Sequence, residues 1–151
     1  MVYELSKDEY QISTDKSLLD VAVIYSYLSK VSYWAQNIPE EVVIKSIANS
    51  LCFGLYKRNE QVGFARLVTD RATFAYLADV FILEQHRGKG LSKWLIEVIQ
   101  SHPELQGLRR WMLGTRDAHG LYEQFGWSEI PEEARKRFMQ RHFPDVYGGA
   151  S

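Results

Sequence analysis

Two glycines, Gly88 and Gly90, are the residues of this chain best suited to bind a phosphate group. They lie between an apolar run, 74–83, typical of a strand, and an amphipathic run, 91–99, typical of a helix. A turn from a strand into a helix points backbone N–H groups at one place, at the positive end of the helix dipole. Because glycine has no Cβ, the backbone can turn sharply there and a phosphate can approach it closely.

The spacing of this turn excludes two common phosphate-binding loops. No Gly-Lys-Ser or Gly-Lys-Thr follows, and Lys93 stands where a dinucleotide-binding fingerprint has its third glycine. The turn does match the pattern Gln/Arg-x-x-Gly-x-Gly/Ala, in which Gln85 is the first residue. This pattern resembles the pyrophosphate loop of the GNAT superfamily, the acyl-CoA-dependent N-acetyltransferases. A glycine pair at the start of a helix also occurs as a plain tight turn.

A second segment carries the same resemblance. Residues 111–115 are typical of a strand, and residues 118–127 read Ala-His-Gly-Leu-Tyr-Glu-Gln-Phe-Gly-Trp. They resemble the GNAT pattern Ala-x-x-Leu/Phe-Tyr-Glu-Lys/Gln-x-Gly-Phe/Trp. The two motifs stand in the order and at the separation typical of that superfamily, and the resemblance spans roughly residues 51–130. It implies an acyltransferase that uses acetyl-CoA.

The resemblance also implies where acetyl-CoA binds. Backbone groups around Phe81 and Ile82, where the strand 73–83 splays from its neighbour, are implied to bind the pantetheine arm. Amides of the glycine turn are implied to hold the pyrophosphate, with charge added by Arg87 and Lys89. The implied residues are Phe81, Ile82, Gln85, Arg87, Gly88, Lys89, Gly90, Leu91, Ser92 and Thr115. Thr115 departs from the pattern, since many members have Asn there, although a hydroxyl could replace that contact.

Acetyl transfer from a thioester to an amine needs a deprotonated amine, a polarised carbonyl and protonation of the leaving thiolate. The resemblance implies that Tyr122 is the general acid, and the pKa of a phenol, about 10, lies near that of a thiol. The alternative is a packed tyrosine whose hydroxyl bonds a backbone carbonyl. The resemblance also implies direct attack by the amine rather than an acyl-enzyme. The only cysteine, Cys52, lies in an apolar run, which agrees with this mechanism.

Asp79 interrupts the apolar strand 73–83. A carboxylate in a central strand is costly unless it has a partner or a function. It could attract a cationic acceptor amine or, through water, accept its proton. The alternative is a structural ion pair with a nearby arginine such as Arg66, and the sequence favours neither.

Two aromatic residues, Tyr33 and Trp34, fall in a loop between the first two expected helices. In the GNAT fold this loop covers the acceptor site, so both side chains could contact the substrate. The alternative is a lid that packs on the core. His119 could act as a base, whereas His86 is expected to pack within the glycine turn.

Hydrophobic periodicity predicts the elements that position these residues. Helices are expected over 18–31, 39–49, 91–101 and 118–125, with a turn or a single helical turn at 131–135. Strands are expected over 3–13, 51–57, 61–69, 73–83, 108–114, 127–130 and 138–142. This order agrees with a single-domain α/β (α+β) GNAT fold over residues 1–151. Its central sheet is expected to be mixed and mostly antiparallel, with helices on both faces.

Length and charge narrow the class of protein. The chain has 151 residues, 46% hydrophobic, and a net charge of −1, which suits one globular domain and argues against a nucleic-acid partner. No apolar run approaches the roughly 20 residues of a membrane helix, and the first ten residues lack a secretory pattern. With a single cysteine, a cytoplasmic location is expected.

The sequence therefore predicts an acetyl-CoA-dependent N-acetyltransferase, a transferase that needs no metal. The expected acceptor is a primary amine of a small molecule or a peptide. The alternative is a non-catalytic CoA-binding or sensing module with the same fold, and the retained Tyr122 favours the enzyme. The sequence identifies neither the acceptor nor the acyl-chain preference, and a homodimer is one option for its assembly.

Overall fold

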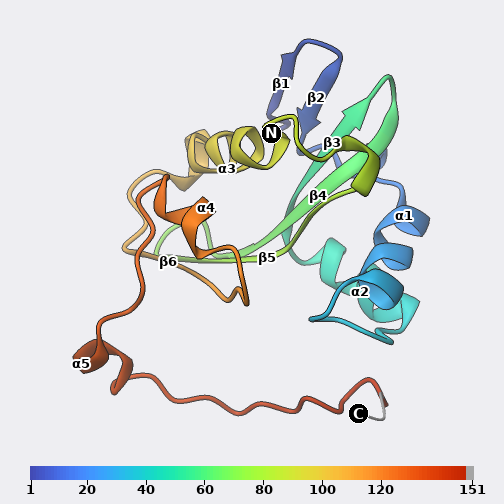
Figure 1. Ribbon diagram of the computed structural model, residues 1–151. Helices are drawn as coiled ribbons and strands as arrows, with labels where there is room; N and C mark the ends of the chain where they lie inside the picture. Colours follow the sequence, from blue (N-terminus) through green and yellow to red (C-terminus); the bar gives the residue numbers. More distant parts are fainter. Residues whose placement is uncertain (149–151) are drawn as a thin grey trace. The chain divides into compact units, whose positions relative to one another are not determined.

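The computed structural model describes residues 1–148 of the chain, and these fall into two units. The first unit, Met1–Gly114, contains the sheet and the glycine-rich turn (Figure 1). The second unit begins at Thr115 and contains two short helices within the described residues. Within residues 1–148, no helix has both the length and the apolar character needed to cross a membrane.

The sheet has six strands, and each pairs with its neighbours in the sequence. All neighbouring pairs are antiparallel except β5 and β6, which are parallel. The strands are β1 (Glu4–Lys7), β2 (Tyr10–Ser13), β3 (Leu51–Lys57), β4 (Glu60–Thr69), β5 (Phe74–Ile82) and β6 (Arg110–Leu113). The parallel pair needs a crossover connection, which contains helix α3 (Leu91–Gln100). The expected mixed, mostly antiparallel sheet is confirmed.

The single strand expected over 3–13 is wrong, because this segment folds into the hairpin β1–β2. Lys7 pairs with Tyr10 across a turn in which Asp8 has a positive φ of 56°. Aspartate tolerates the left-handed conformation better than most residues, so it can occupy a tight turn between two strands. The loose alternation along 3–13 therefore belongs to two strands that run in opposite directions.

The helix expected over 18–31 forms in consecutive pieces. A short 3₁₀ turn, η1 (Lys16–Leu18), precedes α1 (Val21–Ser26), and a π-helical segment, η2 (Tyr27–Val31), follows it. The α1 helix begins after Asp20 because this carboxylate accepts a hydrogen bond from the backbone N–H of Val23, at 3.2 Å. Isolated π segments in helices are frequent at functional sites, and this one begins at Tyr27.

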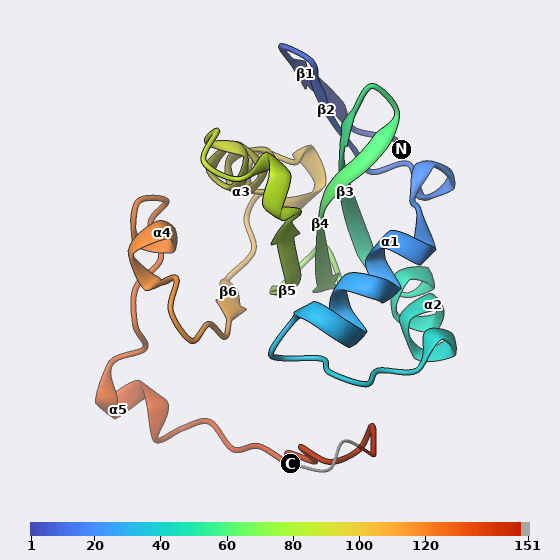
Figure 2. The same cartoon turned by 45° about the vertical axis from the view of Figure 1, so that its right-hand side comes forward.

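Helices cover both faces of the sheet, as expected. In Figure 2, α1 and α2 (Glu40–Ala48) lie on one side of strands β3 to β5, and α3 lies on the other. The core forms between these layers, and its largest fully buried side chains include Ile12, Ile24, Phe53, Leu55, Phe64, Leu67, Leu95 and Ile99. The sheet is therefore a rigid support for the turn between β5 and α3.

The second unit contains α4 (His119–Glu123) and α5 (Glu132–Arg135). The strands expected over 127–130 and 138–142 are both wrong, since neither segment is a strand. The N–H of Trp127 bonds to the carbonyl of Tyr122, and the N–H of Phe138 bonds to that of Arg135. Local turns thus use backbone groups that a strand would offer to a neighbour, and a strand without a neighbour is not stable.

Candidate active site

Strand β5 splays from β6 at its carboxyl end. β5 pairs with β6 only from Phe74 to Leu77, although it continues to Ile82. Beyond this end, the N–H of Leu83 donates to Val62 of β4, at 2.8 Å. The C=O and N–H of one trans peptide group point in opposite directions, so the carbonyl of Ile82 points away from β4. The splay implied by the resemblance is present, and binding of pantetheine there stays a prediction.

A bulge interrupts β5 at Asp79. Phe64 pairs with Phe81 and Arg66 pairs with Ala78, so β5 has one more residue than β4 between these two pairs. Asp79 itself has a positive φ of 55°, a conformation rare for residues other than glycine. The residue that interrupts the apolar pattern of this strand is therefore also the residue at its bulge.

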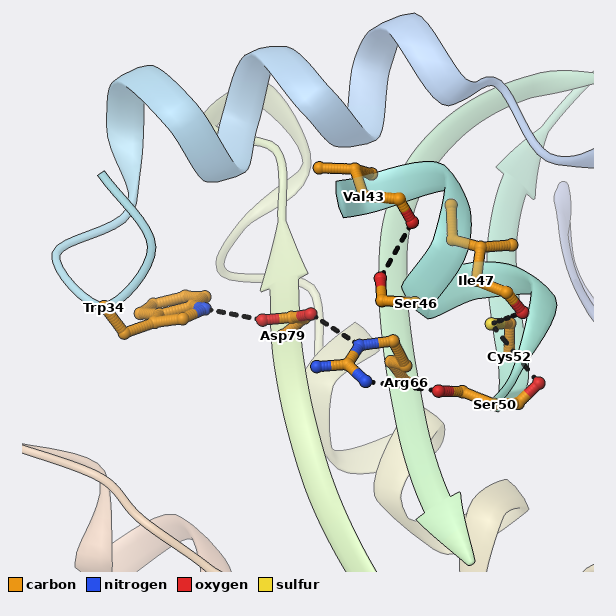
Figure 3. A network of polar contacts seen from close by, with 8 residues as sticks. All are labelled: Trp34, Val43, Ser46, Ile47, Ser50, Cys52, Arg66 and Asp79. Carbon is orange, nitrogen blue, oxygen red and sulfur yellow. Dashed lines mark hydrogen bonds and ion pairs between the residues drawn. The ribbon is translucent and has the colours of Figure 1, made fainter. Parts of the chain in front are cut away.

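Both carboxylate oxygens of Asp79 accept hydrogen bonds (Figure 3). Arg66 Nε donates to Oδ2 at 2.7 Å, and Trp34 Nε1 donates to Oδ1 at 2.8 Å. Arg66 also donates to Ser50 Oγ at 3.1 Å. The Asp79 side chain is only 9% exposed and that of Arg66 is 19% exposed. The ion pair that the sequence offered as an alternative is thus present, and it also holds a predicted acceptor-site residue, Trp34.

The loop residues Tyr33 and Trp34 join a continuous row of aromatic rings. The two rings meet edge-on at 5.0 Å between centroids, and each side chain is about 40% exposed. Trp34 lies 6.4 Å from Tyr27, which stacks on Phe81 at 4.1 Å with an interplanar angle of 11°. The structure therefore connects the predicted acceptor loop to the predicted pantetheine strand. Sequence reasoning missed Tyr27, because its spacing from Leu19 is that of an ordinary apolar helix face.

Both glycines of the turn before α3 have a positive φ. Gly88 has a φ of 78° and Gly90 a φ of 75°, and Gly90 is the residue that precedes α3. No side chain caps the start of this ten-residue helix. A Cβ at either glycine would meet no protein atom within 4 Å, so positive φ, rather than crowding, favours glycine here. The residues fit a pyrophosphate, whose binding stays a prediction.

The charged side chains of the turn point to different partners. Arg87 Nε donates to the carbonyl of Ile82, and its Nη2 donates to the hydroxyl of Tyr27, each at 3.0 Å. Lys89 lines a cavity of about 260 Å³ beside the β1–β2 turn. His86 Nδ1 lies 3.1 Å from the Tyr10 hydroxyl, within hydrogen-bond distance. Burial and the nearby Lys89 lower the pKa of His86, so the neutral imidazole is favoured.

Three further cofactor candidates frame the turn. Gln85 lies in a 3₁₀ turn, η3 (Glu84–His86), directly before it. Leu91 and Ser92 are the first two residues of α3, and Leu91 is buried. The amides of Leu91 and Ser92 therefore lie in the first turn of α3, where backbone N–H groups lack partners within the helix.

The second unit holds the other two candidates. Tyr122 lies in α4, is only 8% exposed, and meets Trp127 ring to edge at 5.8 Å between centroids. Thr115 Oγ1 accepts from the N–H of Ala118 at 3.1 Å, so this threonine stabilises the turn that precedes α4. The catalytic role of Tyr122 and the cofactor contact of Thr115 stay predictions.

Comparisons with known proteins agree with this geometry. Residues 48–129 match the family model described as "Acetyltransferase (GNAT) domain". The Gibberella zeae protein named "Putative acetyltransferase FG08082" is 35% identical over 139 residues, which cover 78% of this chain and 77% of that protein. Its name describes an acetyltransferase, the class of enzyme that the two motifs predicted for this chain.

Solved structures agree as well. A crystal structure of a protein belonging to the GNAT family from Xanthomonas campestris pv. campestris is 47% identical, with a TM-score of 0.88, covering 93% of this chain and 97% of that one. A GNAT acetyltransferase from Elizabethkingia anophelis with acetyl-CoA bound shares the fold at 14% identity and a TM-score of 0.57, covering 79% and 76%. This chain belongs to the GNAT family of acetyltransferases, and it is an acyltransferase.

Proposed function

We propose that the protein transfers an acetyl group from acetyl-CoA to a primary amine of a small molecule or a peptide. The observation that carries this proposal is the path from the splayed end of β5, through Gly88 and Gly90, to the uncapped start of α3. Splayed backbone groups suit the amides of a pantetheine arm, and the helix start suits a pyrophosphate. Acetyl-CoA supplies the activated acyl group when bound, and the residues of this path hold and orient it.

The acceptor is proposed to bind beside the row of aromatic rings that contains Tyr33 and Trp34. Half-exposed aromatic side chains can cover the apolar part of an amine. Asp79 holds Trp34 in place and is proposed to attract the ammonium form of the acceptor. Because Arg66 pairs with this carboxylate, removal of the amine's proton by Asp79 would proceed through water rather than by direct contact.

Direct attack by the amine is proposed rather than an acyl-enzyme. Burial raises the pKa of the Cys52 thiol to about 11, and its sulfur lies 3.7 Å from the carbonyl of Ile47 (Figure 3). A thiol with such a pKa is almost entirely protonated at neutral pH and is a poor nucleophile. Tyr122 is proposed as the acid that protonates the leaving thiolate, on the strength of its motif position. A reduced, buried cysteine is also consistent with the proposed cytoplasmic location.

The test is to measure release of CoA from acetyl-CoA across a panel of primary amines and amino-terminal peptides. We expect turnover with at least one class and acetyl-CoA binding by calorimetry. Binding without turnover over the whole panel would favour the sensing module. Absence of any acetyl-CoA binding would contradict the proposed function itself.

A further inference from the structure

The side chain of Arg87 forms two contacts that a phosphate-binding role alone does not explain. Its guanidinium donates to two neutral oxygens, the carbonyl of Ile82 and the hydroxyl of Tyr27, both at 3.0 Å. Arg87 lies directly before Gly88 in the proposed pyrophosphate turn. The Arg87 side chain thus connects the turn to the end of β5 and to the π-helical segment η2.

The carbonyl of Ile82 is one of the backbone groups of the splayed strand end. It points away from β4, and β6 does not pair with β5 at this level. It is therefore a group that a pantetheine amide could reach, and Arg87 already donates to it. A pantetheine amide that donated to this oxygen would have to share it with Arg87 or displace Arg87.

The second partner, Tyr27, extends this contact toward the acceptor loop. Its ring stacks on Phe81 at 4.1 Å and lies 6.4 Å from Trp34. Because its hydroxyl accepts from Arg87, the guanidinium is fixed from two sides. Displacement of Arg87 from Ile82 therefore needs a ligand group that attracts a guanidinium more strongly than two neutral oxygens do.

A pyrophosphate is such a group, since charge-assisted, bidentate contacts of arginine to phosphate oxygens are about twice as strong as neutral hydrogen bonds. We propose that Arg87 determines specificity for coenzyme A thioesters over pantetheine thioesters that lack the pyrophosphate. The pyrophosphate draws the guanidinium away from Ile82, whose carbonyl then accepts from the pantetheine arm. A phosphate-free pantetheine must compete with Arg87 unaided. This inference rests on the proposed function, and it adds a role for Arg87 and Tyr27.

The experiment compares the dissociation constants of coenzyme A and of pantetheine, by calorimetry and NMR titration, for three proteins. In Arg87→Met, pantetheine no longer competes with a guanidinium for the carbonyl of Ile82. Pantetheine should therefore bind about threefold to tenfold more tightly, the scale of one hydrogen bond. Coenzyme A should bind about tenfold more weakly, because a phosphate ligand is lost. The matched control, Lys89→Met, removes a positive charge from the same turn without this contact. It should weaken coenzyme A and leave pantetheine unchanged.

An unchanged or weaker pantetheine affinity in Arg87→Met would overturn the proposal, because Arg87 would then be only a phosphate ligand or a structural residue. Should this variant not fold, Tyr27→Phe keeps the ring on Phe81 and removes one of the two acceptors. It should raise pantetheine affinity about twofold, and no increase would equally overturn the proposal. Failure of the wild-type protein to bind coenzyme A at all would instead contradict the proposed function.

Discussion

The carboxylate of Asp79 has two properties that are unusual in a reactive group. It is nearly buried, and both of its oxygens are engaged, by Arg66 and Trp34. A buried pair of this kind contributes little net stability compared with apolar residues, but loss of one partner leaves an uncompensated charge. The structural and the functional interpretations of Asp79 can therefore both hold, and they predict different measurements.

Asp79→Asn should lower the free energy of unfolding by about 2–4 kcal/mol, because Arg66 keeps its charge and loses its counter-charge. If Asp79 also attracts the acceptor, KM for the amine should rise while acetyl-CoA affinity is unchanged. Denaturant unfolding and steady-state kinetics on the same variant measure the two effects. A lower melting temperature with normal kinetics at low temperature would restrict Asp79 to the structural role. The control is Glu133→Gln, which breaks an exposed pair with Lys136 and should leave stability unchanged.

Tyr122→Phe should preserve acetyl-CoA binding and lower the turnover number by about 100-fold, the usual effect of losing a general acid. The ring stays in its contact with Trp127, so the melting temperature should change little. Single-turnover kinetics separate the chemical step from product release. A chemical step of normal rate would show that the hydroxyl of Tyr122 serves packing alone.

At the scale of elements, the turn between β5 and α3 is the part that the sequence specified best. Its glycines adopt the positive φ that the motif demands. The effect of a glycine on stability can be separated from its effect on ligand binding, because a second glycine offers a control. Gly107, in the loop before β6, also has a positive φ, of 85°, and open space around its Cβ position. This loop has no place in the proposed acetyl-CoA site.

Gly90→Ala and Gly107→Ala should each lower the free energy of unfolding by about 1–2 kcal/mol, because both force an alanine into the left-handed region. Only Gly90→Ala should also lose acetyl-CoA affinity, since a Cβ would stand at the start of α3 where the pyrophosphate approaches. Isothermal calorimetry and thermal melting of both variants measure this. Equal loss of affinity in the two variants would mean that the turn acts through stability alone.

Prediction from the sequence was best where one strong pattern decides the structure. The run 51–56 is apolar and bounded by polar residues, and β3 has the bounds expected for the strand, Leu51–Lys57. The bulge at Asp79 was out of reach, because a positive φ depends on partners such as Arg66 that lie in another strand. Tyr27 was missed for a related reason, since helical periodicity shows that a ring is buried but not what it stacks on.

At the scale of the whole molecule, the comparisons show the family, whereas the acceptor is inferred from the chain's own residues. The strand predicted over 138–142 is not formed, because the described residues of the second unit contain no other strand with which it could pair. The acceptor is open for a different reason. It depends on a loop whose shape is set by long-range contacts, such as the hydrogen bond from Trp34 to Asp79.

The sequential order of the six strands also bears on how the chain folds. β3, β4 and β5 form a meander joined by short turns, so their pairing closes small loops and costs little chain entropy. The pairing of β2 with β3 encloses α1 and α2, and that of β5 with β6 encloses α3, so both close much longer loops. We expect the meander to form first and these two pairings to limit the rate. Mutational φ-values near 1 in β2 or β6, and near 0 in β4, would contradict this order.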